Sequence, residues 1–124
     1  MAKVLIVDDD KIFLNIATLS FQRDGHEVFT ALDAYSALDI VFDKRIELVV
    51  TDINMPFGYS GFRFAQSLRK ASEIKSLPIV FVSSRRDGES IHRALKAGGN
   101  DYFLKPVDFA HLIKKCEGLL AANR

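Results

Sequence analysis

Three short runs of consecutive apolar residues constrain the fold of this 124-residue chain most strongly. They begin at Val4, Leu48 and Ile79 and are rich in β-branched side chains. Runs of four or five such residues, apolar on both faces, are typical of strands buried in the middle of a parallel sheet. The second run ends before Pro56, which lacks a donor for strand pairing and restricts the residue before it. Asp52 is therefore expected at the carboxyl end of a central strand.

Helical patterns alternate with these runs. After Asp10, which can cap a helix, Ile12, Ile16 and Leu19 recur at i, i+4 and i+7 and predict an amphipathic helix. Residues able to cap four further helices are Asp33, Ser60, Asp87 and Asp108. The more polar runs around Val28 and Tyr102 are expected to be edge strands.

Five strands alternating with five helices predict an α/β fold. The expected architecture is a doubly wound, five-stranded parallel sheet of the flavodoxin-like type, with strand order 2-1-3-4-5 and helices on both faces. The length suits one domain, so we expect residues 1–124 to form a single domain.

Composition excludes several classes of protein. Seventeen basic and sixteen acidic residues leave a formal net charge of +1, which favours neither direct nucleic-acid binding nor an anionic membrane surface. The single cysteine, Cys116, cannot form an internal disulfide. The apolar stretch at the N-terminus is too short for a signal peptide or a membrane span. A cytoplasmic protein is the expectation.

The carboxyl ends of all five strands meet at one edge of such a sheet, where ligands collect. Asp8 and Asp9 follow the first strand, Asp52 the third, Ser83 the fourth and Lys105 the fifth. Three carboxylates in one cleft repel each other, and a hard cation such as Mg²⁺ offsets that repulsion. A lysine suits phosphate, and a serine can donate to a phosphoryl oxygen. The set matches the requirements of phosphoryl transfer.

Each of these residues also has an ordinary structural explanation. Asp8 and Asp9 could be additional helix caps, Ser83 a common strand-end residue, and Lys105 a solvated edge lysine. Because five such residues fall at equivalent strand ends, the functional interpretation is favoured.

The chain resembles the receiver domain of two-component response regulators over nearly its whole length. The matching segments are VLIVDDD (residues 4–10), TDINMP (51–56), LPIVFVS (77–83) and AGGNDYFLKP (97–106). The resemblance implies a CheY-like fold and a signalling domain that transfers phosphate only to itself, so that it is not an enzyme acting on a separate substrate.

The resemblance also implies a role for each matching residue. Asp52 would be the phosphoacceptor, with Asp8, Asp9, Asp52 and the backbone carbonyl of Asn54 as the Mg²⁺ site, Ser83 as the switch hydroxyl, Tyr102 as the switch aromatic and Lys105 as the lysine that contacts phosphate. The Lys105-Pro106 peptide is expected to be cis.

Partners follow from the same resemblance. The phosphoryl donor would be a phosphohistidine on a histidine kinase or phosphotransfer protein. A downstream effector domain or protein would recognise the fourth helix, fifth strand and fifth helix, about Ile91 to Leu119. A homodimer is possible.

The sequence departs from the family pattern at several places. The loop from Phe57 to Gly61 is one residue longer than usual, and Ser84 and Gly99 stand where alanine is common. Arg85 occupies a position said to tune phosphoryl lifetime in this family.

Three other classes of protein fit less well. An aspartyl-phosphate hydrolase of the haloacid-dehalogenase type would use the Asp8-Asp9-Asp10 run, but the chain lacks room for a substrate cap. A flavin-binding module needs a phosphate-cradling loop after the first strand, where three aspartates would repel the phosphate. A pseudo-receiver without chemistry is disfavoured because all the site residues are present.

Overall fold

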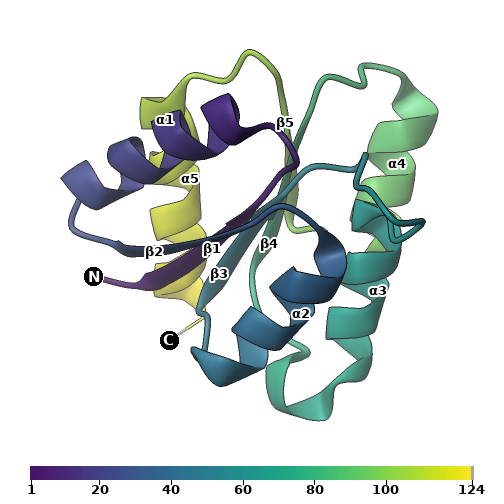
Figure 1. The fold of residues 1–124 in the computed structure, drawn as a ribbon, viewed down its shortest axis with the longest axis horizontal. Helices are drawn as coiled ribbons and strands as arrows, with labels where there is room; N and C mark the ends of the chain where they lie inside the picture. The colour runs from purple at the N-terminus through teal and green to yellow at the C-terminus, as the bar shows by residue number, and fades with distance from the viewer. Residues whose placement is uncertain (124) are drawn as a thin grey trace.

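The computed structural model describes residues 1–123, which form five parallel strands, five α-helices and one short 3₁₀ helix (Figure 1). In chain order these are β1 (Lys3–Val7), α1 (Lys11–Arg23), β2 (Glu27–Ala31), α2 (Ala34–Asp43), β3 (Leu48–Thr51), α3 (Gly61–Lys70), η1 (Ser72–Ile74), β4 (Ile79–Ser83), α4 (Gly88–Ala97), β5 (Asp101–Leu104) and α5 (Phe109–Ala122). The strand order is β2-β1-β3-β4-β5. This confirms the predicted doubly wound α/β fold, while a single domain over residues 1–124 stays a prediction.

The sheet lies between two layers of helices (Figure 1). Side chains along each strand point alternately to its two faces, so the strands contribute to an apolar cluster on each face. In β1, Val4 and Ile6 join the apolar cluster beneath α1 and α5, whereas Leu5 and Val7 join the cluster beneath α2, α3 and α4. Strands β1, β3 and β4 are almost completely buried, and the edge strands β2 and β5 are partly exposed. The apolar runs therefore occupy the centre of the sheet, as their composition predicts.

Helix α1 is confirmed, but its predicted apolar stripe does not face the core. Ile12, Ile16 and Leu19 are 71%, 49% and 62% exposed. The buried face carries Leu14, Ala17 and Phe21, which repeat at i, i+3 and i+7. Both stripes satisfy helical periodicity, and packing against the sheet selects the one that contains Phe21.

The predicted capping residues begin the helices where expected. The side chains of Asp10, Asp33, Ser60, Asp87 and Asp108 each accept a hydrogen bond from a backbone N–H in the first turn. These caps satisfy donors that the helix cannot pair internally. The loops that lead from the strands to these caps lie at the carboxyl edge of the sheet, and the one between β3 and α3 is the longest of them.

Gly99, which stands where alanine is common in the family, has a local structural reason. A Cβ atom at this position would lie 2.7 Å from Cδ2 of Phe81. Phe81 is a fully buried side chain of the central strand β4. The larger side chain on β4 thus requires the smaller residue after α4.

The α-helices within residues 1–123 are 10 to 14 residues long. None of them is long and apolar enough to cross a membrane.

Candidate functional site

Asp52 lies just past β3 and is held by its backbone and one carboxylate oxygen. Its N–H donates to the carbonyl of Val7 on β1 at 3.1 Å. Its Oδ1 atom accepts a hydrogen bond from the N–H of Ile53 at 2.6 Å. The side chain is 12% exposed, and Oδ2 faces Lys105. One oxygen is thus held by the backbone, while the other points to the carboxyl edge of the sheet and pairs with Lys105.

The close approach of α3 to Asp52 depends on Gly61. A Cβ atom on this glycine would lie 2.0 Å from the carbonyl oxygen of Asp52. The N–H of Gly61 donates to the carbonyl of Ile53 at 2.8 Å, which anchors the start of α3 beside the site. Only a residue without a side chain permits this packing.

Lys105 joins two carboxylates from different strands. Its Nζ atom lies 2.6 Å from Oδ2 of Asp8 and 3.2 Å from Oδ2 of Asp52. Partial burial alone would lower the pKa of Lys105, but the two carboxylates outweigh it and raise the pKa above its usual value. The Lys105-Pro106 peptide is cis, as the resemblance implies. The lysine therefore carries a fixed positive charge at the centre of the site.

Asp8 is the most buried carboxylate of the group, with a side chain 1% exposed. Its Oδ1 atom accepts from the N–H of Asp10 at 2.9 Å. Burial raises the pKa of the Asp8 carboxyl, although the hydrogen bonds from Lys105 and Asp10 act in the opposite direction. An ionised Asp8 thus depends on a nearby cation.

Asp9 and Asn54 lie at the outer side of the site. The Asp9 side chain is exposed, and the side-chain oxygen of Asn54 accepts a hydrogen bond from the guanidinium of Arg85. No three His, Cys, Asp or Glu side chains among residues 1–123 are arranged to hold a metal ion. The structure therefore joins Asp8 and Asp52 through Lys105, whereas the Asp9 side chain faces solvent.

The oxygen atoms at this edge nevertheless suit Mg²⁺ chemically. Mg²⁺ is commonly bound through one or two carboxylates, with water completing an octahedral shell. Asp8 and Asp52 already share one cation, the Lys105 ammonium, which shows that their charges converge on one point. The donor set of two carboxylates and nearby carbonyls fits a hard divalent ion.

Ser83 and Tyr102 are linked through the backbone of Arg85. Ser83 is fully buried, and its Oγ atom accepts from the N–H of Arg85 at 3.2 Å. The Tyr102 hydroxyl donates to the carbonyl of Arg85 at 2.7 Å. Its ring stacks on Phe81 with centroids 6.4 Å apart, and burial raises the pKa of its hydroxyl. The switch candidates thus already contact one short loop.

Two contributions to this site were not foreseen from the sequence. The Arg85 guanidinium reaches back to Asn54, which lies in the loop after β3, and it also lies 6.0 Å from the ring centroid of Phe62 on α3. The Phe13 ring on α1 lies 4.4 Å from the Lys105 Nζ atom. Strand-end positions identify which loops meet, but they do not reveal which long side chains cross between loops.

Comparison with known proteins places the chain in a family. Residues 4–117 match the response regulator receiver domain family. The protein PilH of Pseudomonas aeruginosa is 30% identical over 98% of this chain and 99% of its own length. The transcriptional regulatory protein AfsQ1 of Streptomyces coelicolor is 32% identical over 86% of this chain, which spans only 46% of AfsQ1. The chemotaxis protein CheY4 of Vibrio cholerae is 30% identical, with a TM-score of 0.89 over 96% of this chain and 98% of that one.

These similarities establish the class of protein. The chain belongs to the response regulator receiver domain family, whose members act in phosphorylation-dependent two-component signalling. Such domains are generally signalling modules and not enzymes, they generally bind Mg²⁺, and they work with histidine kinases and effector domains.

Proposed function

We propose that Asp52 accepts a phosphoryl group from a phosphohistidine of a partner protein. The observation that carries this proposal is the position of Lys105, whose ammonium joins Asp52 to the buried Asp8 carboxylate. Oδ1 of Asp52 accepts the short hydrogen bond from the N–H of Ile53, and we assign Oδ2, which faces the Lys105 ammonium, as the attacking atom. The N–P bond of the donor breaks, its electron pair stays on the imidazole nitrogen, and an O–P bond forms at Oδ2.

Neutralisation of charge is the main contribution of the chain to this step. Lys105 places a positive charge 3.2 Å from the attacking oxygen, where the phosphoryl oxygens arrive. Ser83, at the end of the neighbouring strand β4, supplies a hydroxyl that donates to one of those oxygens. Asp8, Asp9, Asp52 and the carbonyl of Asn54 would hold Mg²⁺, which supplies further positive charge when bound.

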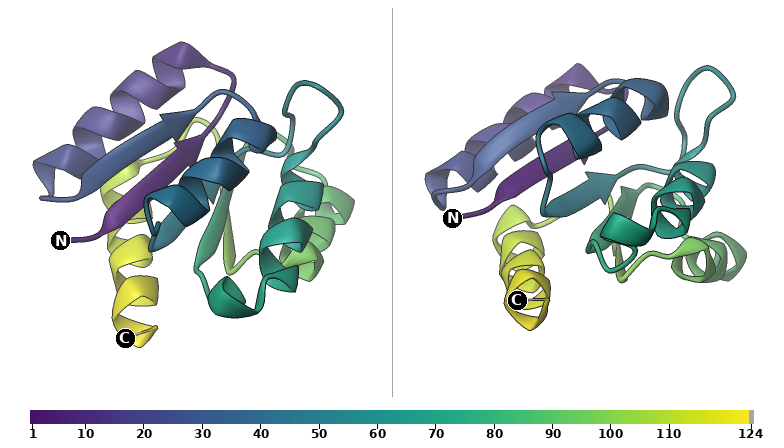
Figure 2. Two further views of the ribbon diagram at one scale, coloured as in Figure 1. Left: turned by 60° about the horizontal axis from the view of Figure 1, so that its bottom comes forward. Right: turned by 90° about the horizontal axis from the view of Figure 1, so that it is seen from below.

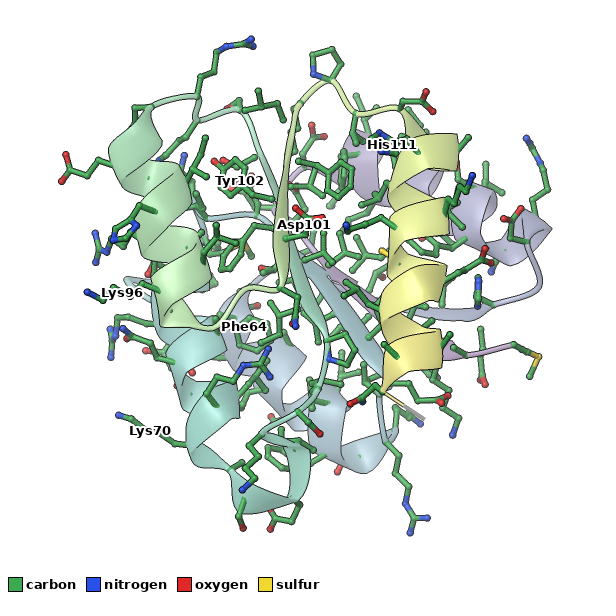
Figure 3. The ribbon with its side chains drawn as sticks, turned by 180° about the vertical axis from the view of Figure 1, so that it is seen from behind. Phe64, Lys70, Lys96, Asp101, Tyr102 and His111 are labelled. Atoms are coloured by element: carbon green, nitrogen blue, oxygen red, sulfur yellow. The ribbon has the colours of Figure 1, made fainter. Side chains whose placement is uncertain are left out.

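Phosphorylation is expected to be read out on the surface formed by α4, β5 and α5. Figure 3 shows this surface, with Tyr102 and Asp101 on β5 between α4 and α5 and with His111 on α5. A phosphoryl group on Asp52 adds charge and acceptor oxygens near Ser83. A shift of Ser83 towards it changes the Arg85 backbone that both Ser83 and Tyr102 contact. Tyr102 thereby transmits the change to the surface.

The partners of the site follow from its chemistry. The donor is a histidine kinase or a histidine phosphotransfer protein, because an aspartate carboxylate accepts phosphate readily from a phosphoramidate nitrogen. A downstream effector domain or protein binds the α4–β5–α5 surface. A homodimer through the same surface is one form that this recognition can take.

Incubation with phosphoramidate and Mg²⁺ tests the proposal against a hydrolase. We expect one phosphoryl group per chain and phosphate release no faster than the decay of the phosphorylated protein. An aspartyl-phosphate hydrolase would release many equivalents per chain. A hydrolase of this type would use the Asp-x-Asp pattern formed by Asp8 and Asp10. The Asp10 carboxylate instead caps α1 by accepting from the N–H groups of Ile12 and Phe13, which supports the receiver over the hydrolase.

A further inference from the structure

The loop between β3 and α3 has an unusual backbone at two consecutive residues. Phe57 has φ 67° and Gly58 has φ 69°, so both are left-handed. Glycine adopts this conformation freely, but a bulky side chain such as Phe57 does so at a cost in free energy. Strain of this kind is retained where the surrounding structure enforces it, and it is concentrated at functional sites.

Packing of the Phe57 ring offers no compensation for this strain. The side chain is 75% exposed. Within residues 1–123 it makes no aromatic contact and joins neither apolar cluster, whereas Met55 and Tyr59 on either side do pack against the core. A small polar residue would satisfy the fold better at this position, because asparagine adopts left-handed backbone more readily.

The backbone beside Phe57 is nevertheless firmly held. Arg63 donates from Nη1 to the carbonyl of Gly58 at 2.9 Å, and its guanidinium lies 5.4 Å from the centroid of the Tyr59 ring. The Tyr59 hydroxyl donates to Oγ of Ser67 at 2.7 Å. These contacts tie the loop to α3. Phe57 is therefore presented to solvent by a braced loop.

A second exposed aromatic residue lies next to this loop. Tyr35, in the first turn of α2, is 55% exposed, and its ring meets Tyr59 edge-on with centroids 4.7 Å apart. Figure 2 shows the β3–α3 loop projecting beyond the carboxyl edge of the sheet, on the side of α2 and α3. The loop begins immediately after Asp52. Any protein that brings a histidine to Asp52 must approach this same edge.

We propose that Phe57, supported by Tyr35, is an apolar contact for the protein that donates the phosphoryl group, and that this contact contributes to the choice of donor. The inference rests on the proposed function of Asp52. The occupant is a phosphohistidine-bearing protein with an apolar surface beside its histidine. Aromatic side chains are common anchors of protein interfaces because each covers a large area with few rotatable bonds.

The small size of the patch favours a transient donor over a second copy of this chain. Two aromatic side chains cover roughly 150–250 Å² each. A stable interface buries about 1,200–2,000 Å² in total. A donor must leave after each transfer, and a contact of this size permits rapid release.

The test compares a protein donor with a small one. Purified histidine kinase cores are autophosphorylated with radiolabelled ATP. The kinase that transfers its phosphoryl group fastest to the full wild-type chain is selected for the comparison. Phe57→Asn removes the ring while keeping a residue that tolerates the left-handed backbone. We expect transfer from this kinase to Phe57→Asn to slow about tenfold, phosphorylation by phosphoramidate to be unchanged, and the melting temperature to stay equal or rise. Phe42→Asn, at a 46% exposed phenylalanine of α2, is the matched control and should behave as wild type.

Each other outcome has a definite meaning. Equal transfer from the kinase to wild type and Phe57→Asn overturns the inference, and so does slowing with both donors, because the loop would then act on the chemistry. A dimer in sedimentation that is lost in Phe57→Asn assigns the residue to self-association and also overturns it. If phosphoramidate labels Asp52 but no kinase in the panel does, the docking inference fails and the proposed function stands. If neither donor labels the wild type, the proposed function itself fails.

Discussion

The ammonium of Lys105 makes its shorter contact with Asp8 and not with Asp52. Nζ lies 2.6 Å from Oδ2 of Asp8 and 3.2 Å from Oδ2 of Asp52. Because the Asp8 side chain is 1% exposed, this ion pair is almost removed from water, and its energetics depend strongly on any third charge. A divalent ion attracted to Asp8 must compete with the lysine, which couples metal binding to the position of Lys105.

Replacement of Lys105 by glutamine should strengthen Mg²⁺ binding. The substitution removes a positive charge beside the carboxylates, so a second cation no longer meets repulsion. Calorimetric titration should give a lower dissociation constant for Lys105→Gln than for wild type, and phosphorylation by phosphoramidate should slow. Lys114→Gln, at an exposed lysine of α5, is the control. Weaker Mg²⁺ binding in Lys105→Gln would show that the lysine does not compete with the metal.

The burial of Asp8 predicts a pH-dependent cost in stability when Mg²⁺ is absent. The pKa of its carboxyl is raised above 3.8 in the folded state, so the unfolded chain loses this proton first. The stability of the wild type relative to Asp8→Asn therefore falls as pH rises through the folded pKa. In urea titrations between about pH 4 and pH 7, the free energy of unfolding of Asp8→Asn should increase relative to that of the wild type as pH rises. A free energy of unfolding that rises with pH in the wild type relative to Asp8→Asn would contradict this account.

Gly61→Ala should destabilise the fold and slow phosphorylation together. The added Cβ would lie 2.0 Å from the Asp52 carbonyl oxygen, so α3 or the Asp52 backbone must move. Overpacking of this kind costs about 1–3 kcal/mol. Gly118→Ala is the matched control, because nothing lies within 4 Å of a Cβ at that exposed position in α5. It should stabilise the protein by about 0.5–1 kcal/mol. Equal stability of the two variants would contradict the close approach of α3.

Several features of the fold were predictable because independent signals agreed. The apolar runs beginning at Val4, Leu48 and Ile79 identified the central strands, and the capping residues located the helix starts. Helix α1 shows where such signals fail. Its residues at 12, 16 and 19 and those at 14, 17 and 21 are both spaced for a helix face, so periodicity alone does not choose between them.

The site was predictable at the level of loops but not of side-chain contacts. Strand order alone brings Asp8, Asp52 and Lys105 to one edge. The shorter contact of Lys105 with Asp8 depends on rotamers and burial, which strand positions do not fix. The same holds for the outward position of Asp9 and for the reach of Arg85 to Asn54. The assignments of these residues to phosphate and metal remain predictions.

Beryllofluoride, a mimic of the phosphoryl group, should alter the surface formed by α4, β5 and α5. Tyr102 contacts the Arg85 carbonyl, and Ser83 accepts from the Arg85 N–H, so movement of Ser83 reaches the tyrosine through one residue. NMR spectra should show shifts at Ser83, at Tyr102 and along α5. In Tyr102→Ala the shifts should shrink to the Asp52 pocket, and in Asp52→Asn they should vanish. Shifts confined to the pocket in the wild type would rule out this readout.

Intact mass after treatment with phosphoramidate and Mg²⁺ tests the central proposal most directly. The wild type should gain the mass of one phosphoryl group, because Oδ2 of Asp52 faces the Lys105 ammonium while Oδ1 is held by the N–H of Ile53. Asp52→Asn should gain none, and fragmentation of the wild type should place the group on Asp52. A full gain of mass in Asp52→Asn, or a group mapped to Asp8, would contradict the assignment of Asp52 as the phosphoacceptor.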